Sequence, residues 1–287
     1  MKKVLLTGST GFIGSNLLRE LYHKNQMFLI LRSNSKNNYI LKDYKNIKII
    51  YYDRFDDLDK KLKKLTIDIV IHCATHYVRN HSFGDILQLN NSNIIFGNII
   101  LENLKLMKVK KFINFSTVWE DYDAIKNNNC NLYAAYKKSF TNIINYYTKI
   151  LPSIKFFNLM ISDTFGENDN RYKIINVLKK NYKKNKVTKI VSKNLHINLL
   201  NIKDITQAVH LLMINNIRSG QYLLKNKFNY RVIDLINLFN NEYQKKIKVK
   251  WLSNKIIKEK IFPYKKLVGW ISMRSSKIDI IKIIRDK

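Results

Sequence analysis

A glycine-rich turn near the start of the chain constrains the fold more than any other feature of the sequence. It follows the short apolar run Lys3–Leu6 and opens a stretch, Gly11–Lys24, with the pattern of a helix. The turn reads Thr7-Gly8-Ser9-Thr10-Gly11-Phe12-Ile13-Gly14. Gly8 permits a tight turn, Gly11 lets backbone approach a pyrophosphate, and Gly14 lets helix pack close to strand. Phosphates would then lie at the positive helix N-terminus, so the turn predicts a dinucleotide site.

Short apolar segments alternate with longer helical stretches through the N-terminal half of the chain. The expected strands are rich in Ile, Val, Leu or Phe and bounded by polar residues, as buried parallel strands are. They are Lys3–Leu6, Phe28–Leu31, Ile47–Tyr52, Ile67–His72, Lys111–Phe115 and Lys155–Ile161. The expected helices are Gly11–Lys24, Asp56–Leu65, Asn93–Met107 and Leu132–Lys149. This alternation predicts an α/β fold with right-handed crossovers and a Rossmann-type, doubly wound parallel sheet.

The pattern changes after Ile161. Residues 162–171 are polar and contain glycine, so we expect a loop. The elements expected beyond it are a helix at Tyr172–Lys184, a strand at 195–203, a helix at 204–216, a strand at 221–224 and a helix at 231–243. We therefore predict a nucleotide-binding domain over 1–161 and a small α/β substrate lobe over 162–287. Segments at about 195–215 are expected to cross back to the sheet.

The chain carries a formal net charge of +31 over 287 residues, which raises the question of a nucleic-acid partner. Its lysines are spread along the whole chain and accompany many Asn, Ile and Tyr residues. That distribution indicates a compositional bias and a solvated lysine surface, so we expect no nucleic-acid partner. A positive field would still help to attract negatively charged nucleotides.

The sequence gives little support for a secreted, membrane or metal-binding protein. No apolar run approaches the roughly 18 residues that suggest a membrane span. Polar residues 7–10 interrupt the apolar start before a signal-peptide core can form. The two cysteines, Cys73 and Cys130, are too few for a disulfide framework, and no metal-ligand spacing is present. We expect a cytoplasmic protein without a membrane partner or a metal site.

The Gly-x-x-Gly-x-x-Gly spacing resembles the opening motif of the extended short-chain dehydrogenase/reductase family, also called the NAD-dependent epimerase/dehydratase family. The resemblance implies a nicotinamide cofactor. It also implies that Asp53, just after the third strand, contacts the adenine, and that Ala74, after the fourth, lies against the cofactor. The contacts implied for the turn itself are Gly8, Thr10, Gly11, Phe12, Ile13 and Gly14.

The end of the second strand indicates which nicotinamide cofactor is used. A carboxylate there would accept hydrogen bonds from the adenosine ribose and repel a 2′-phosphate. This chain has Arg32 and Ser33 at that place. Arg32 can pair with the phosphate and Ser33 can donate a hydrogen bond to it. The sequence therefore predicts NADPH/NADP+ as the cofactor.

A Tyr-x-x-x-Lys motif opens the helix expected at Leu132–Lys149. Tyr133 and Lys137 lie four residues apart, and therefore on one helix face. The ammonium lowers the pKa of the phenol, which can then act as acid or base near neutral pH, and Lys137 can also hold the nicotinamide ribose. The resembled family carries this motif at this position, with a Ser or Thr ending the preceding strand. Its pattern favours Thr117 as the donor to the substrate oxygen, and Ser116 is the alternative.

Members of the resembled family mostly act on nucleotide sugars as epimerases, dehydratases or ketoreductases. Val118-Trp119 follow Thr117 where dehydratases carry acidic residues, and Arg32 stands where NAD-holding epimerases carry a carboxylate. The sequence therefore favours reduction of a 4-keto group by NADPH. An epimerase with bound NAD(P) and a non-catalytic NADP-binding protein stay open as alternatives.

Several segments resemble the CDP-paratose and CDP-abequose synthases, family members that reduce a 4-keto group on a CDP-3,6-dideoxy sugar. The segments are Tyr77-Val78-Arg79, Phe165-Gly166 with Asp169–Lys173, Leu199–Asp204 and Gly269-Trp270. The resemblance implies substrate contacts at Tyr77, Arg79 and Arg171, and a homodimer. It also implies a nucleotide-diphosphate 4-keto sugar as substrate, with a CDP-linked hexose or heptose favoured, for surface-polysaccharide sugar biosynthesis. The chain departs from these synthases at Ile197-Asn198, where an Arg-Asp pair is usual.

Overall fold

The structure is a computed structural model that describes residues 1–35, 44, 47–243, 246–258 and 260–285. The chain forms two compact units, each with its own core. The first consists of 1–160, 209–223 and 262–266, and the second of 161–208, 224–261 and 267–287. In the described part of the chain, no helix is long and apolar enough to cross a membrane.

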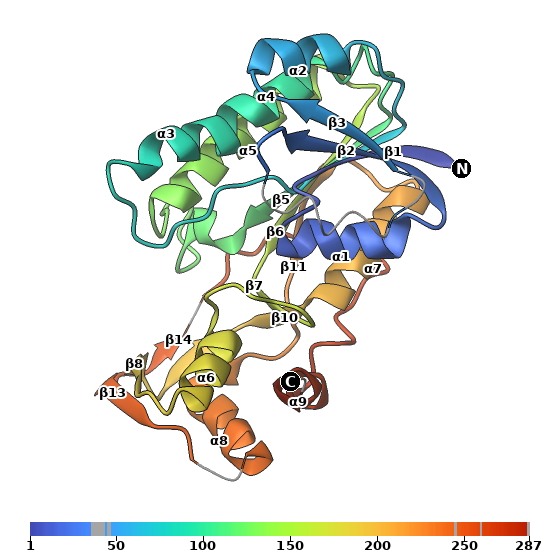
Figure 1. The fold of residues 1–287 in the computed structure, drawn as a ribbon. Helices are drawn as coiled ribbons and strands as arrows, with labels where there is room; N and C mark the ends of the chain where they lie inside the picture. Colours follow the sequence, from blue (N-terminus) through green and yellow to red (C-terminus); the bar gives the residue numbers. More distant parts are fainter. Residues whose placement is uncertain (36–43, 45–46, 244–245, 259, 286–287) are drawn as a thin grey trace. The chain divides into compact units, whose positions relative to one another are not determined.

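An eight-stranded sheet forms the centre of the first unit (Figure 1). Its strand order is β15-β11-β6-β5-β4-β1-β2-β3. The strands are β1 Lys2–Thr7, β2 Asn25–Arg32, β3 Ile47–Tyr52, β4 Ile69–His72, β5 Lys111–Thr117, β6 Lys155–Ile161, β11 Gly220–Leu224 and β15 Lys265–Lys266. β1 pairs in parallel with both β2 and β4. The predicted doubly wound parallel sheet is confirmed, and the strand order reverses beside β1, where open α/β sheets bind their ligands.

The helices of the first unit lie on both faces of this sheet (Figure 1). They are α1 Phe12–Leu21, α2 Phe55–Leu62, α3 Asp85–Asn90, the π-helical segment η2 Asn91–Ile95, α4 Phe96–Glu102 and α5 Leu132–Ile150. α1 covers one face, and α2, α4 and α5 cover the other. Side chains from β1, β2, β4 and β5 meet those of α2, α4 and α5 in one buried cluster, which includes Leu5, Val70, Phe112 and Phe140.

The helix predicted at Asn93–Met107 was wrong at both ends, because helical structure runs from Asp85 to Glu102. Polar contacts fix the start of this helix at Asp85. The Asp85 carboxylate accepts hydrogen bonds from the backbone N–H and the hydroxyl of Ser82, both at 2.7 Å. The π-helical segment η2 inserts extra backbone and shifts the phase of the apolar stripe. A search for one uninterrupted 3.6-residue period therefore could not join α3 to α4.

Close contact between α4 and α5 fixes the helix that carries the Tyr-x-x-x-Lys motif. A Cβ at Gly97 of α4 would lie 2.3 Å from Cζ of Phe140 on α5, closer than real carbon atoms approach. Only glycine therefore allows this helix pair to pack as it does. Phe140 itself is 1% exposed.

The second unit is a small α/β lobe with three minor sheets, ordered β10-β7, β12-β9-β14 and β13-β8. Its strands are β7 Asp163–Phe165, β8 Thr188–Ser192, β9 Leu195–Ile197, β10 Leu199–Asn201, β12 Tyr230–Arg231, β13 Val249–Ser253 and β14 Ile257–Lys258. Its helices are α6 Ile174–Lys183, the first part of α7 Ile202–Ile214, α8 Val232–Glu242 and α9 Lys277–Arg285. The helices predicted near α6, α7 and α8 are confirmed.

Two predictions for the second unit were wrong. Residues 162–171 are not all loop, because they contain β7, which pairs with β10. The single strand expected at 195–203 is broken at Asn198 into β9 and β10, which belong to different sheets. Asn198 is fully buried, and its side chain accepts from Ser162 Oγ at 2.7 Å and donates to the carbonyl of Asn226 at 2.9 Å. A structural anchor thus occupies the position where the resembled synthases carry an aspartate.

Candidate active site

The glycine turn has the geometry of a phosphate cradle. Gly8 has φ of +67°, and its carbonyl accepts from the Gly11 N–H at 3.0 Å. Gly11 is the N-cap of α1 and supplies no side-chain cap. A Cβ at Gly14 would lie 2.1 Å from the Gly8 oxygen. The predicted close packing of turn and helix is confirmed, and the first-turn amides have the arrangement that helix N-termini use to bind anions.

A hydrogen-bonded triangle joins this turn to the end of β4. The Ala74 N–H donates to Thr7 Oγ1 at 3.1 Å, and the same oxygen lies 3.0 Å from His72 Nδ1. Burial lowers the pKa of His72 to about 3, with the nearby Lys137 ammonium as a lesser cause, so the ring is neutral. A Cβ at Gly8 would lie 2.7 Å from the Ala74 nitrogen. Ala74 therefore lies directly against the turn, at the place expected for a cofactor contact.

Arg32, Ser33 and Asp53 lie together at the carboxyl edge of the sheet. Arg32 ends β2 opposite Tyr52, and the Ser33 N–H donates to the Tyr52 carbonyl at 3.0 Å. Asp53 directly follows β3, and all three side chains are exposed. The structure therefore brings the predicted adenosine-contacting residues to one edge, where a dinucleotide on the glycine turn would extend.

Tyr133 and Lys137 lie on the first two turns of α5. The side chain of Asn131 caps the helix by accepting from the Ala134 N–H at 2.9 Å. Lys137 is 5% exposed, whereas Tyr133 is half-buried. The Tyr133 ring meets the Tyr77 ring edge to face, with centroids 5.0 Å apart. The predicted substrate residue Tyr77 is thus brought to the predicted proton donor, while Arg79 lies exposed two residues further on.

The two candidate hydroxyls at the end of β5 are in different surroundings. The Ser116 hydroxyl donates to the carboxyl of Glu120 in the interior. Thr117 is the last residue of β5, and its hydroxyl oxygen accepts from the Trp119 N–H at 3.3 Å. Since Ser116 is engaged inside the fold, this geometry supports Thr117 as the residue that would donate to a substrate.

Burial controls the charge of the groups behind the site. It lowers the pKa of Lys137, and the Glu120 carboxyl and the Cys73 thiol partly oppose that shift. It raises the pKa of the Cys73 thiol, which is therefore uncharged at neutral pH. Glu120 is fully buried, and burial likewise raises the pKa of its carboxyl. Burial thus opposes the charged form of all three groups.

Sequence reasoning missed three residues of the site. Asn93, in η2, accepts from the Thr75 hydroxyl at 3.0 Å and the His76 N–H at 2.7 Å, and so fixes the segment leading to Tyr77. The Trp119 ring lies 6.2 Å from the Tyr77 ring. The buried Glu120 carboxyl accepts from the Ser116 hydroxyl. The available signals were an asparagine in an apolar stripe and an acidic residue three positions after Thr117.

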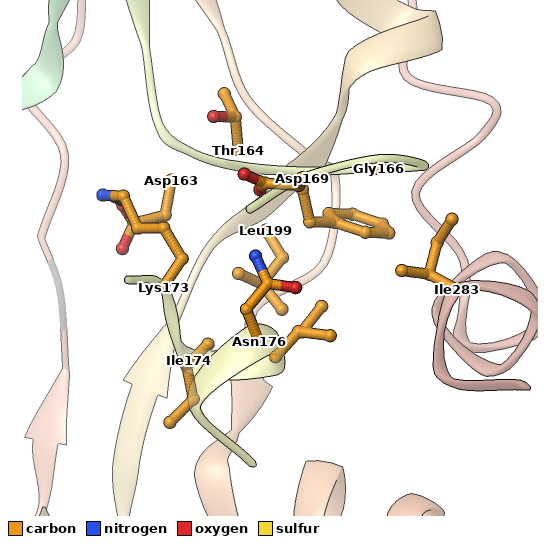
Figure 2. Close-up of a pocket in the computed structure, with 11 residues that line it drawn as sticks. Asp163, Thr164, Gly166, Asp169, Lys173, Ile174, Asn176, Leu199 and Ile283 are labelled. Carbon is orange, nitrogen blue, oxygen red and sulfur yellow. Dashed lines mark hydrogen bonds and ion pairs between the residues drawn. The ribbon is translucent and has the colours of Figure 1, made fainter. Parts of the chain in front are cut away.

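Arg171, the third predicted substrate residue, lies in the second unit. Its guanidinium donates to both carboxylate oxygens of Asp169, at 2.7 and 2.8 Å, and to Thr164 Oγ1 at 2.8 Å. Asp169 and Thr164 line the pocket shown in Figure 2, together with Lys173, which pairs with Asp163 at 2.6 Å. The charged side chains that line this pocket are therefore already paired, Asp163 with Lys173 and Asp169 with Arg171, and a substrate role for Arg171 stays a prediction.

A family model described as the NAD dependent epimerase/dehydratase family matches residues 4–224. The match contains the glycine turn together with Thr117, Tyr133 and Lys137. The chain belongs to this family. The resemblance inferred from the sequence motifs is thus confirmed, and the family's NAD dependence agrees with a nicotinamide cofactor at the glycine turn.

Two proteins similar to this chain are both CDP-abequose synthases. The chain is 29% identical over 222 residues to the CDP-abequose synthase of Yersinia pseudotuberculosis, which covers 77% of this chain and 75% of that protein. It is 25% identical over 222 residues to the CDP-abequose synthase of Salmonella muenchen, covering 77% and 73%. Among solved structures, the UDP-N-acetylglucosamine 4-epimerase of Methanobrevibacter ruminantium has a TM-score of 0.83 at 22% identity, covering 99% of this chain and 96% of that one. The last likeness supports the Rossmann-type fold.

Proposed function

We propose that this chain is an NADPH-dependent reductase of the 4-keto group of a nucleotide-diphosphate deoxy sugar. The proposal rests chiefly on the half-buried Tyr133 phenol, placed one helical turn from the buried Lys137 ammonium and against the Tyr77 ring. The substrate class rests on the likeness to the CDP-abequose synthases over about three quarters of both chains. A CDP-linked hexose or heptose, destined for a surface polysaccharide, is the favoured substrate.

The residues present fit a nicotinamide dinucleotide. The positive φ of Gly8 and the uncapped first turn of α1 suit the pyrophosphate, and a Cβ at Gly14 would destroy that cradle. Arg32 and Ser33 are exposed at the end of β2 and can hold a 2′-phosphate by charge-assisted hydrogen bonds. When bound, the cofactor supplies the hydride.

The chain's own residues supply the proton and the orientation. Tyr133 donates its hydroxyl proton to the oxygen of the sugar carbonyl. The Lys137 ammonium lowers the pKa of that phenol by its positive charge and holds the nicotinamide ribose. The Thr117 hydroxyl donates a hydrogen bond to the same sugar oxygen and turns it towards Tyr133. Such general acid catalysis contributes about 100- to 10,000-fold to the rate.

A second candidate is a nucleotide-sugar epimerase. Its support is the fold likeness to the Methanobrevibacter ruminantium 4-epimerase. Against it, Arg32 ends β2 and no carboxylate occupies that place in the described chain. A carboxylate would favour the unphosphorylated cofactor that an epimerase holds permanently.

We also propose that the protein acts as a homodimer in the cytoplasm. Apolar side chains are exposed on and beside α3 and on α5, where Phe83 is 92%, Leu87 68% and Tyr146 58% exposed. Exposed apolar side chains of this size suit a subunit interface. Light scattering of the purified protein would give twice the 34.1 kDa chain mass.

The test of the proposed function is incubation with NADPH and a panel of freshly made 4-keto nucleotide sugars. We expect loss of NADPH absorbance with at least one member of the panel, and a product hydroxylated at carbon 4. Activity should be lost in Tyr133→Phe. If no 4-keto sugar oxidises NADPH while a non-keto sugar nucleotide is epimerised, the second candidate replaces the first.

A further inference from the structure

Three aromatic side chains from separate segments of the first unit meet at the proposed proton donor. Tyr77 follows β4, Trp119 belongs to the short 3-10 helix η3, Val118–Asp121, and Tyr133 lies on the first turn of α5. The Tyr77 ring meets the Tyr133 ring edge to face, with centroids 5.0 Å apart and planes at 86°. The Trp119 ring lies 6.2 Å from the Tyr77 ring, with planes at 41°. The aromatic pair Tyr77 and Trp119 therefore adjoins the phenol, and the reaction scheme above gives Trp119 no part.

Hydrogen bonds hold the backbone that carries each ring of the aromatic pair. The Trp119 N–H donates to Thr117 Oγ1 at 3.3 Å. His76, which precedes Tyr77, donates its N–H to Asn93 Oδ1 at 2.7 Å, and its carbonyl accepts from Asn93 Nδ2 at 3.0 Å. The two rings therefore project from anchored backbone, as side chains that select a ligand by its shape should.

The aromatic pair also connects the two residues proposed to hold the sugar oxygen. Trp119 is bonded to the Thr117 hydroxyl through its backbone, and Tyr77 contacts Tyr133 through its ring. Thr117 and Tyr133 are proposed to bond one carbonyl oxygen, on carbon 4 of the sugar. The carbons on either side of carbon 4 therefore enter the same part of the site as the aromatic pair. These are carbon 3 and carbon 5, and the latter carries carbon 6.

Both rings of the aromatic pair leave surface that a ligand can cover. Tyr77 is 40% exposed, and Trp119, like Tyr133, is half-buried. Covering such rings with C–H groups is favourable because it removes apolar surface from water. A hydroxyl covered by a ring face loses its water without gaining a hydrogen bond, which is unfavourable. The pair therefore favours a sugar edge that carries hydrogen in place of a hydroxyl.

We propose that Trp119, together with Tyr77, recognises the deoxygenated edge of the sugar, at carbon 3 or carbon 6. The inference rests on the proposed reductase function and names the residues that select a deoxy sugar over a fully hydroxylated one. Thr117 and Tyr133 bind the reacting oxygen, which every 4-keto sugar possesses. Trp119 and Tyr77 bind the part of the sugar in which deoxy and hydroxylated substrates differ, and so determine specificity.

Binding of stable sugar nucleotides tests this selection without turnover. Dissociation constants would be measured by calorimetry, with NADPH present, for glucose, 3-deoxyglucose and 6-deoxyglucose linked to CDP, and in parallel for the UDP-linked and dTDP-linked sets. None of these sugars has a keto group at carbon 4 that NADPH could reduce. The variants are Trp119→Ala, Trp119→Phe, which keeps an aromatic ring, and the control Trp251→Ala. Trp251 is also half-buried, but it packs against the core of the second unit.

We expect at least one deoxy sugar to bind the unmodified protein about 10- to 100-fold more tightly than the glucose form, because apolar sites reject an added hydroxyl to that extent. Trp119→Ala should bind that deoxy sugar no better than the glucose form, whereas Trp119→Phe and Trp251→Ala should keep the ratio. If Trp119→Ala does not fold, Tyr77→Ala removes the other ring and should lower the same ratio. Equal binding of all three sugars, binding of none, an unchanged ratio in the folded variant, or a loss of NADPH affinity alone overturns the inference.

The binding measurements also separate this inference from the proposed reaction. A protein that oxidises NADPH with a 4-keto nucleotide sugar but binds deoxy and hydroxylated sugars equally supports the reaction and overturns the role of Trp119. A protein that prefers a deoxy sugar through Trp119 but oxidises no NADPH with any 4-keto sugar supports the role of Trp119 and contradicts the reaction. A purely structural role for Trp119 would lower the Tm of Trp119→Ala and leave the binding ratio unchanged.

Discussion

Replacing Gly14 with alanine tests whether the glycine turn depends on close backbone packing. The added Cβ would lie 2.1 Å from the Gly8 oxygen and 2.7 Å from the Gly8 carbonyl carbon. Both are backbone atoms of a turn fixed by the Gly11 N–H bond and by Ala74, so no flexible side chain can yield. Alanine gains roughly 1 kcal/mol of helix propensity over glycine. Overpacking a tight site costs about 1–3 kcal/mol and sometimes more, so the clash should win.

We therefore expect Gly14→Ala to lower the free energy of unfolding by up to about 2 kcal/mol and to weaken NADPH binding at least tenfold. The loss corresponds to a fall in Tm of roughly 2–4 °C per kcal/mol for a chain of this size. Denaturant unfolding would measure stability, and enhancement of NADPH fluorescence would measure binding. Both effects have one cause, because the turn and the start of α1 must separate to admit the methyl group.

Alanine substitutions at two other glycines provide a comparison for Gly14→Ala, because an added Cβ would be less crowded there. Gly84→Ala is the control, since its Cβ would come no closer than 3.8 Å to the Ser82 hydroxyl and should be tolerated. Gly11→Ala is intermediate, because its Cβ would lie 3.3 Å from the Gly8 oxygen. That variant should keep most of its stability but lose affinity for NADPH, since its methyl group occupies the approach to the pyrophosphate. Equal stability of Gly14→Ala and Gly84→Ala would refute the packing argument.

Three further substitutions test separate parts of the site. Tyr133→Phe should keep the fold and NADPH affinity but reduce turnover about 100- to 10,000-fold; near-normal kcat with a 4-keto sugar would show that another group donates the proton. Arg32→Ala should weaken NADPH binding by roughly 1.5–3 kcal/mol while leaving NADH binding little changed; an equal loss for both cofactors would remove Arg32 from the 2′-phosphate. His72 has its pKa lowered to about 3 by burial, so the unfolded chain takes up a proton below about pH 6.5 that the fold excludes. Its stabilising contribution is present above that pH and falls by up to about 1.4 kcal/mol per unit as pH decreases towards 3. Denaturation of His72→Asn should show a shallower loss of stability between about pH 6 and pH 4, and an unchanged slope would contradict this.

Local sequence predicted the sheet well because each central strand is an apolar run bounded by polar residues. The bounds of β3 and β6 agree with prediction for that reason. The glycine turn and the Tyr-x-x-x-Lys motif were placed correctly because spacing alone determines which strand and helix hold them. Short strands such as β12 and β14 could not be predicted, since two residues form a strand only by virtue of a distant partner.

The residues that support the site could not be predicted from the sequence for a different reason. Glu120 looks like a solvated acid in the sequence, and only the packing of β5 against α5 shows that it is buried and hydrogen-bonded to Ser116 and Thr141. Asn93 interrupts an apolar stripe, and its role becomes visible only when the chain after β4 folds back onto η2. The break at Asn198 likewise follows from partners about 30 residues away. These roles depend on tertiary contacts that local patterns do not contain.

Transfer of label from NADPH to the sugar tests the proposed reductase activity most directly. The purified protein would be incubated with a 4-keto nucleotide sugar and NADPH deuterated at the transferable position. The proposed function predicts one NADPH consumed per product, with the deuterium at carbon 4 of the sugar and the adjacent hydroxyl proton drawn from solvent through Tyr133. Conversion of one non-keto sugar nucleotide into its epimer, with no net consumption of NADPH and no deuterium in the product, would contradict it.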